Sequence, residues 1–181
     1  MSDFEHVKNQ YIEFWKASGG EKVFKTRGTS MLPLIGESSS IGVKPLVSEK
    51  QLKVGDIALF NRDGCLIAHR IIGRIKEGNA VYYTEKGDCG LSLTMIAKEQ
   101  IIGKVVKIYT AEGAVNLEKP LWLIINRAVG YYWQYLIKSF VYASRIKKQL
   151  VGNKGLPLVG TFYSRLYRLL SRLPTVIFRF K

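Results

Sequence analysis

Residues 56–72 read Asp56-Ile-Ala-Leu-Phe-Asn-Arg-Asp-Gly-Cys-Leu-Ile-Ala-His-Arg-Ile-Ile72, and this stretch decides the fold class. Two apolar runs flank the turn residues Asn61-Arg-Asp-Gly64, a pattern typical of a β-hairpin. Further strand-like runs occupy residues 80–84 and 100–109. The sequence therefore predicts a mainly β domain over residues 23–112.

Helical patterns flank the predicted β domain on both sides. Residues 3–17 place apolar and aromatic side chains three and four positions apart and precede Gly19-Gly20, which predicts an N-terminal helix within residues 1–22. Helical periodicity returns after about residue 117, and a break at 152–157 separates two amphipathic segments. We therefore assign residues 113–181 to a basic amphipathic helical extension.

The net charge of +14 belongs mostly to this extension. Residues 113–181 hold 12 Lys and Arg but a single acid, Glu118, whereas residues 1–112 hold 16 basic and 13 acidic residues. Because 12 of the 21 aromatic residues also lie there, we expect an anionic, partly apolar partner. An anionic membrane surface fits this demand better than nucleic acid, which remains the less favoured partner.

Two basic stripes are predicted to meet this membrane surface. The first comprises Arg127, Lys138 and Arg145, and the second comprises Arg165, Arg168 and Arg172. The alternative is that both helices dock their apolar faces on the β domain and expose the basic side chains to water.

The rest of the composition indicates a globular protein of the cytoplasm. Hydrophobic residues at 47% exclude a disordered or collagen-like chain. Two cysteines and two histidines form no metal-ligand pattern, so we expect neither a metal nor a cofactor. The first residues carry acids and no apolar run, which predicts neither a signal peptide nor a leading anchor. We expect a peripheral position on the inner face of the membrane.

A candidate nucleophile stands in the run Arg27-Gly-Thr-Ser-Met-Leu-Pro-Leu-Ile35. Ser30 lies between Gly28 and Pro33, in a turn from which its hydroxyl can project. A serine nucleophile needs a base, and His69 is the histidine expected to pack beside it. The run Tyr83-Thr-Glu-Lys-Gly-Asp88 ends a predicted strand with a turn that can aim the Asp88 carboxylate at an imidazole.

The order of these motifs resembles a known superfamily. The motifs are Ser30-Met-Leu-Pro33, Val54-Gly-Asp-Ile57, Ala68-His-Arg-Ile71 and Thr84-Glu-Lys-Gly-Asp88. Together they resemble the signal peptidase superfamily, which includes LexA-like self-cleaving proteins. The His-Arg-Ile run is similar to the archaeal and endoplasmic-reticulum type, in which histidine stands where most bacterial signal peptidases have lysine. The resemblance covers roughly residues 23–109.

This resemblance implies a signal peptidase-like or LexA-like β core and a serine endopeptidase. The enzyme would cut a leader-peptide-like or signal-peptide-like substrate beside a small residue. Ser30 would be the nucleophile, with its N–H in the oxyanion hole, His69 the base and Asp88 the orienting acid. Met31 would contact the small side chain of the substrate. Lys86 is the rival base.

Other residues near these motifs receive structural interpretations. The resemblance makes Asp56 an architectural residue of a Gly-Asp turn. Cys65 and Cys89 lack a second histidine nearby, so we interpret them as small core residues rather than as nucleophiles.

The chain also departs from the pattern of the superfamily. A helical pattern typical of soluble proteins, rather than a membrane-anchor pattern, leads into the serine motif. Residues 89–94 lack a further acid, and Gly28 supplies no hydroxyl to an oxyanion. The alternative function is therefore a catalytically inactive or self-cleaving relative that acts as a membrane-binding or nucleic-acid-binding module.

Overall fold

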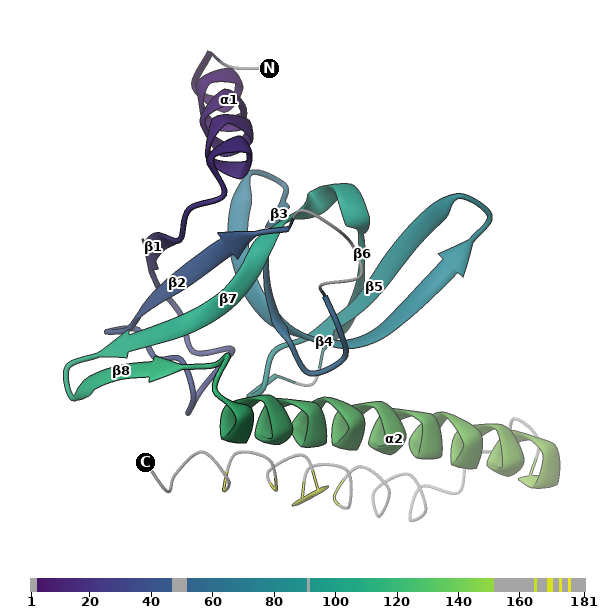
Figure 1. Cartoon of the computed structure of the whole chain (residues 1–181). Coiled ribbons are helices and arrows are strands. Elements are labelled where there is room, and N and C mark those ends of the chain that lie inside the picture. Colours follow the sequence, from purple (N-terminus) through teal and green to yellow (C-terminus); the bar gives the residue numbers. More distant parts are fainter. Residues whose placement is uncertain are drawn as a thin grey trace.

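The computed structural model describes residues 3–46, 52–90 and 92–151, together with residues 165, 169, 170, 173 and 176. Helix α1 (Asp3–Ser18) precedes the strands, and helix α2 (Pro120–Val151) follows them (Figure 1). The strands are β1 (Lys22–Lys25), β2 (Ser40–Pro45), β3 (Ile57–Arg62), β4 (Cys65–Glu77), β5 (Ala80–Lys86), β6 (Leu93–Ala97), β7 (Ile101–Thr110) and β8 (Gly113–Asn116), with the 3-10 helix η2 (Lys98–Gln100) before β7.

The strands form one curled antiparallel sheet in the order β1-β2-β7-β3-β4-β5-β6, with β8 paired to β7. The predicted mainly β fold with flanking helices is therefore confirmed. The hairpin predicted at residues 56–72 is the β3–β4 pair, in which Arg62 faces Cys65 across the turn. Strands β3 and β4 occupy central positions in the sheet, so this hairpin places its residues next to the core.

Helix α2 crosses one end of the curled sheet (Figure 1). Its inward side chains Val129, Trp133 and Leu136 belong to the main hydrophobic core. The helix backbone also passes very close to the turn before β3, because a Cβ on Gly55 would lie 2.3 Å from the Asn126 carbonyl oxygen. The absence of a side chain at Gly55 therefore lets α2 dock on the β domain.

The structure revises two expectations from the sequence. The boundary predicted at residue 112 falls in the turn between β7 and β8, because residues 113–116 add a strand to the sheet. Cys65 and Cys89 are both exposed free thiols rather than core residues. Cys65 stands at the corner of the β3–β4 hairpin, where a side chain points into solvent.

Candidate active site

Ser30 lies in the loop that leaves β1. Its neighbour Met31 is buried at 3% exposure and fixes the loop against the core, while Ser30 itself remains exposed. The Cys89 N–H donates to the Ser30 carbonyl oxygen at 2.8 Å, which ties this loop to the turn after β5. Within the described part of the chain, the Ser30 N–H donates to no other group.

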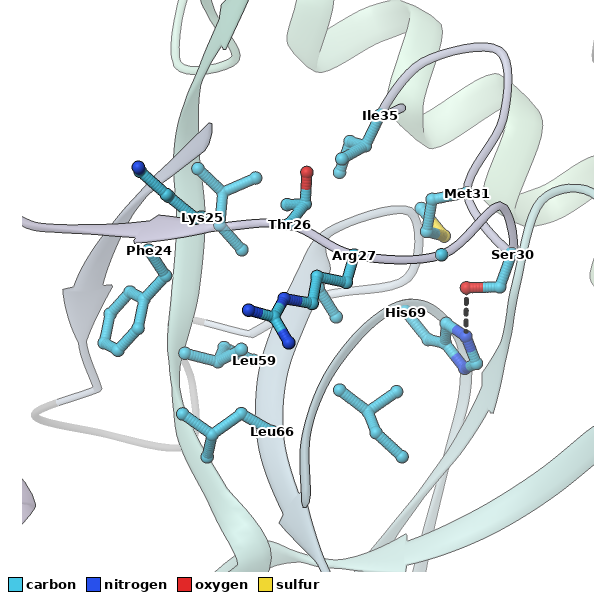
Figure 2. A pocket seen from close by; sticks show the side chains of 14 residues that line it. Phe24, Lys25, Thr26, Arg27, Ser30, Met31, Ile35, Leu59, Leu66 and His69 are labelled. Atoms are coloured by element: carbon cyan, nitrogen blue, oxygen red, sulfur yellow. Dashed lines mark hydrogen bonds between the residues drawn. The ribbon is translucent and has the colours of Figure 1, made fainter. Parts of the chain in front are cut away.

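His69 lies on β4 and contacts the serine. Its Nε2 is 2.9 Å from the Ser30 Oγ (Figure 2), and its Nδ1 is 2.6 Å from the Glu85 Oε2. An ionised carboxylate only accepts hydrogen bonds, so the Nδ1 proton faces Glu85. Nε2 is then left to accept the proton of the Ser30 hydroxyl. The structure thus brings together the two residues that the sequence paired.

Glu85 is the carboxylate that orients the imidazole. It lies on β5 with 1% exposure, and its second oxygen accepts a hydrogen bond of 2.5 Å from the half-buried Arg62. Burial alone would raise the pKa of Glu85, but the hydrogen bonds from His69 and Arg62 outweigh burial and hold that pKa below its ordinary value. Glu85 therefore stays ionised beside the imidazole near neutral pH.

The prediction that Asp88 orients His69 is wrong. Both Asp88 oxygens accept hydrogen bonds of 2.7 Å from the buried Arg70 guanidinium, which also donates to the Gly55 carbonyl oxygen and to the Asn126 side chain. Asp88 therefore anchors the turn after β5 to the turn before β3 and to α2.

The strand register explains this exchange of roles. Arg70 on β4 faces Lys86 on β5. Because side chains alternate across a sheet, His69 and Glu85 share one face, whereas Arg70, Lys86 and Asp88 belong to the other face. Glu85 and Asp88 differ in parity, so only one of them can share the face of His69, and the strand register decides which.

Gly87 allows Ser30 and His69 to approach each other. A Cβ at this position would lie 2.7 Å from the Ser30 carbonyl oxygen and 3.2 Å from the His69 Nε2. The first distance is shorter than real Cβ contacts, so a side chain here would displace the Ser30 loop. Gly87 is a functional position that the sequence analysis did not single out.

Lys86, the rival base, points away from the serine. Its ammonium donates to the carbonyl oxygens of Gly87 and Gly90 and lies 3.4 Å above the centre of the Trp133 ring. Burial lowers the pKa of Lys86 to about 8, although the Asp88 charge acts in the opposite direction. The low pKa suits a base, but the ammonium is engaged on the face of the sheet that packs against α2.

A pocket of about 370 Å³ opens beside the Ser30 and His69 side chains (Figure 2). Met31 lines this pocket together with residues of β1, β3 and β4, and its contact with a substrate stays a prediction. The pocket volume falls in the usual range of small-ligand sites, about 300–1,000 Å³. The candidate nucleophile therefore borders a cavity that can receive a side chain.

Asp56 is buried near the start of α2. Its carboxylate accepts a hydrogen bond of 2.9 Å from the Lys53 N–H and lies 3.2 Å from the Lys104 ammonium. The Arg127 guanidinium donates to the Val54 carbonyl oxygen and lies 3.5 Å from the same carboxylate. Arg127 is thus held on the β domain, which corrects its assignment to a free lipid-facing stripe.

The other five predicted membrane-facing residues have two outcomes. Lys138 and Arg145 are exposed on α2, and Arg165 is exposed as well. Arg168 and Arg172 lie outside the described residues. No described helix is both long enough and apolar enough to cross a bilayer.

Comparison with known proteins adds no relative. Neither a scan against protein-family models nor a search of curated proteins found a match to this chain. The functional argument therefore rests on the contacts among Ser30, His69 and Glu85 and on the order of the motifs that contain them.

Proposed function

We propose that this chain is a serine endopeptidase of the signal peptidase-like type. The observation that carries the proposal is the continuous hydrogen-bonded row from the Ser30 Oγ through the His69 imidazole to the Glu85 carboxylate, at 2.9 and 2.6 Å. A nucleophile, a base and an orienting acid in this geometry support acyl transfer.

The proposed reaction follows from the orientation of these groups. The Ser30 Oγ attacks the carbonyl carbon of the scissile peptide bond while its proton passes to the His69 Nε2. The Ser30 N–H, which is free of other partners among the described residues, donates to the oxyanion that forms. The protonated imidazole then gives its proton to the leaving amine, and water hydrolyses the acyl-serine by the reverse sequence of proton transfers.

The edge of the sheet favours an extended peptide as substrate. Strand β1 pairs with β2 on one side and, among the described strands, has no partner on the other. Because the Thr26 N–H donates toward β2, strand alternation turns the backbone of Lys25 away from β2. A peptide that adds to this edge runs alongside the pocket toward Ser30. A small residue at the scissile bond would suit the crowded contact of Ser30 with Gly87.

A serine-directed phosphonylating probe tests this proposal. A fluorophosphonate should label the purified chain at Ser30 and release its leaving group, and the Ser30→Ala variant should remain unlabelled. The exposed Ser38 lies in the same loop and provides a matched control, because Ser38→Ala should label like the wild type. Absence of labelling in the wild-type chain, or equal labelling of the Ser30→Ala variant, would refute the peptidase proposal.

A specific surface supports the second part of the proposal, peripheral attachment to an anionic membrane. The side of α2 that faces away from the core exposes Ile124, Tyr135 and Tyr142 at 67%, 64% and 67%. Their spacing of eleven and seven residues keeps them on one helical stripe, next to the exposed Lys138 and Arg145. Tyrosines with flanking cations are typical of helices that lie in the headgroup plane.

Vesicle sedimentation tests this attachment. The chain should sediment with anionic vesicles and much less with neutral ones, and Lys138→Glu should weaken binding more than Lys76→Glu. Lys76 is the matched control because it is exposed at the tip of the β4–β5 hairpin, and both changes alter the net charge equally. Equal effects of the two variants, or equal binding to both vesicle types, would exclude α2 as an attachment surface.

A further inference from the structure

The pocket beside Ser30 has an apolar floor. Fourteen residues line it, and those on its inner wall are buried core side chains with exposures of 2–3%. They are Met31, Ile35, Ile41 and Leu59. On the outer side, Phe24 and the 39% exposed Leu66 extend the apolar surface toward solvent. An apolar side chain that enters this pocket would lose its contact with water over most of its surface.

The rim of the same pocket is cationic. Lys25 and Arg27 line it, and its fourteen residues include no Asp or Glu. Neither cation forms an ion pair with any carboxylate in the described part of the chain. Figure 2 shows the Arg27 guanidinium extending toward Leu59 and Leu66, whereas the Lys25 ammonium extends from the other side of the same segment.

The nearest carboxylate of the site does not neutralise this rim. Glu85 is buried, and its two oxygens are occupied by His69 and Arg62. Arg62 is itself held by that carboxylate. No described carboxylate pairs with Lys25 or Arg27, so these two cations can attract a negatively charged group of a ligand.

Distance along the chain determines where the ligand charge belongs. Arg27 and Lys25 precede Ser30 by three and five positions. An extended peptide advances about 3.3 Å per residue. With its scissile carbonyl at the Ser30 Oγ, a peptide that runs beside this segment brings its residues about three to five positions from the bond opposite Arg27 and Lys25. Alternate residues of the same peptide face the apolar floor.

On the basis of the peptidase function proposed above, we infer that the substrate is an acidic and apolar peptide. It has a small residue at the scissile bond, an apolar side chain that fills the pocket, and an Asp or Glu within about five residues of the bond on the pocket side. A lysine at that acidic position meets the charges of Lys25 and Arg27 and is disfavoured.

Internally quenched peptides that differ at a single position test the inference. Glu, Gln and Lys are compared at the acidic position, with a constant small residue at the bond and a constant Leu as the pocket anchor. The wild type should prefer Glu over Lys by about fivefold or more in kcat/KM, mainly through KM, and added salt should reduce this preference. Arg27→Glu should reverse the order, whereas the matched charge change Lys76→Glu should leave it intact.

A binding measurement separates this inference from the peptidase proposal. Fluorescence anisotropy of the labelled peptides on the Ser30→Ala variant reports the charge preference without any cleavage. Preferential binding of the Glu peptide without turnover by the wild type supports the acidic ligand and refutes the peptidase. Turnover or binding of the Glu, Gln and Lys peptides within a factor of about two overturns the acidic specificity, as does an unchanged order in the Arg27→Glu variant.

Discussion

Arg62 and Glu85 form a 2.5 Å ion pair that leaves one carboxylate oxygen for His69. Arg62 comes from the end of β3 and Glu85 from β5, so the pair spans β4, which carries the imidazole. The guanidinium holds Glu85 in the orientation and in the charge state that the imidazole requires.

Removing Arg62 should therefore change the pH profile of cleavage. The hydrogen bond from Arg62 lowers the pKa of Glu85, so Arg62→Gln should raise that pKa toward its ordinary value of 4.5. Turnover of the variant relative to the wild type should then fall as the pH drops from about 6 toward 4.5. The measurement is kcat across this range, with Lys76→Gln as a control. A ratio that stays constant with pH would show that Arg62 does not act through the charge of Glu85.

Ser30 and His69 should behave as one unit in a double-mutant comparison. Ser30→Ala and His69→Ala should each reduce kcat by at least about 10³-fold, and the double variant should be little slower than either single one. Both side chains lie at the surface of the pocket, so the melting temperature should change little. If the losses in log kcat of the two single variants add up in the double variant, the two residues act independently of each other.

Glu85 and Asp88 should give opposite phenotypes. Glu85→Gln should reduce kcat by about 10²- to 10⁴-fold in a folded protein, because the imidazole loses its orienting carboxylate. Asp88→Asn should destabilise the fold by about 3–5 kcal/mol, because it leaves the buried Arg70 charge without its partner. Urea unfolding and kcat measure the two effects, and Asp63→Asn on an exposed turn is the control. Normal stability of Asp88→Asn together with a large loss of kcat would restore Asp88 as the orienting acid.

Lys86 should contribute a specific pH dependence to stability. Its pKa falls from 10.5 to about 8 in the folded chain, so the unfolded chain binds more protons between these values and stability rises with pH in this interval. Below about pH 8 the ammonium is charged in both states, and the burial cost is fully present. The difference in unfolding free energy between wild type and Lys86→Met should change by roughly 3 kcal/mol across the interval. A difference that is flat from pH 8 to 10.5 would contradict the lowered pKa.

The sequence predicted the pairing of Ser30 with His69 but not the third member of the row. Motif order selected the serine and the histidine, and both motifs lie next to strong β patterns. The choice between Glu85 and Asp88 depends on the β4–β5 register, which shifts at an irregularity between Ile71 and Gly73. Such an irregularity arises from three-dimensional packing and leaves no clear mark in a single sequence.

The boundaries of the β domain were predicted less well for a related reason. The sequence predicts that the β domain ends at residue 112, yet the turn there reverses the chain so that β8 can pair with β7. Residues 113–116 are too few to give a convincing alternation on their own. Residues 113–116 form a strand because they pair with β7, and not because of their own strand propensity.

The docking of α2 makes the helix and the candidate active site mechanically inseparable. Trp133 covers Lys86, and Asn126 holds the Arg70 guanidinium that anchors Asp88, so the helix supports the turn that meets the Ser30 loop. The outer stripe of the same helix is the surface proposed to rest on lipid. A bilayer under α2 would then fix the distance between the Ser30 hydroxyl and the lipid headgroups. Substrates would be sorted by how far their scissile bond stands from the membrane, in addition to their side chains.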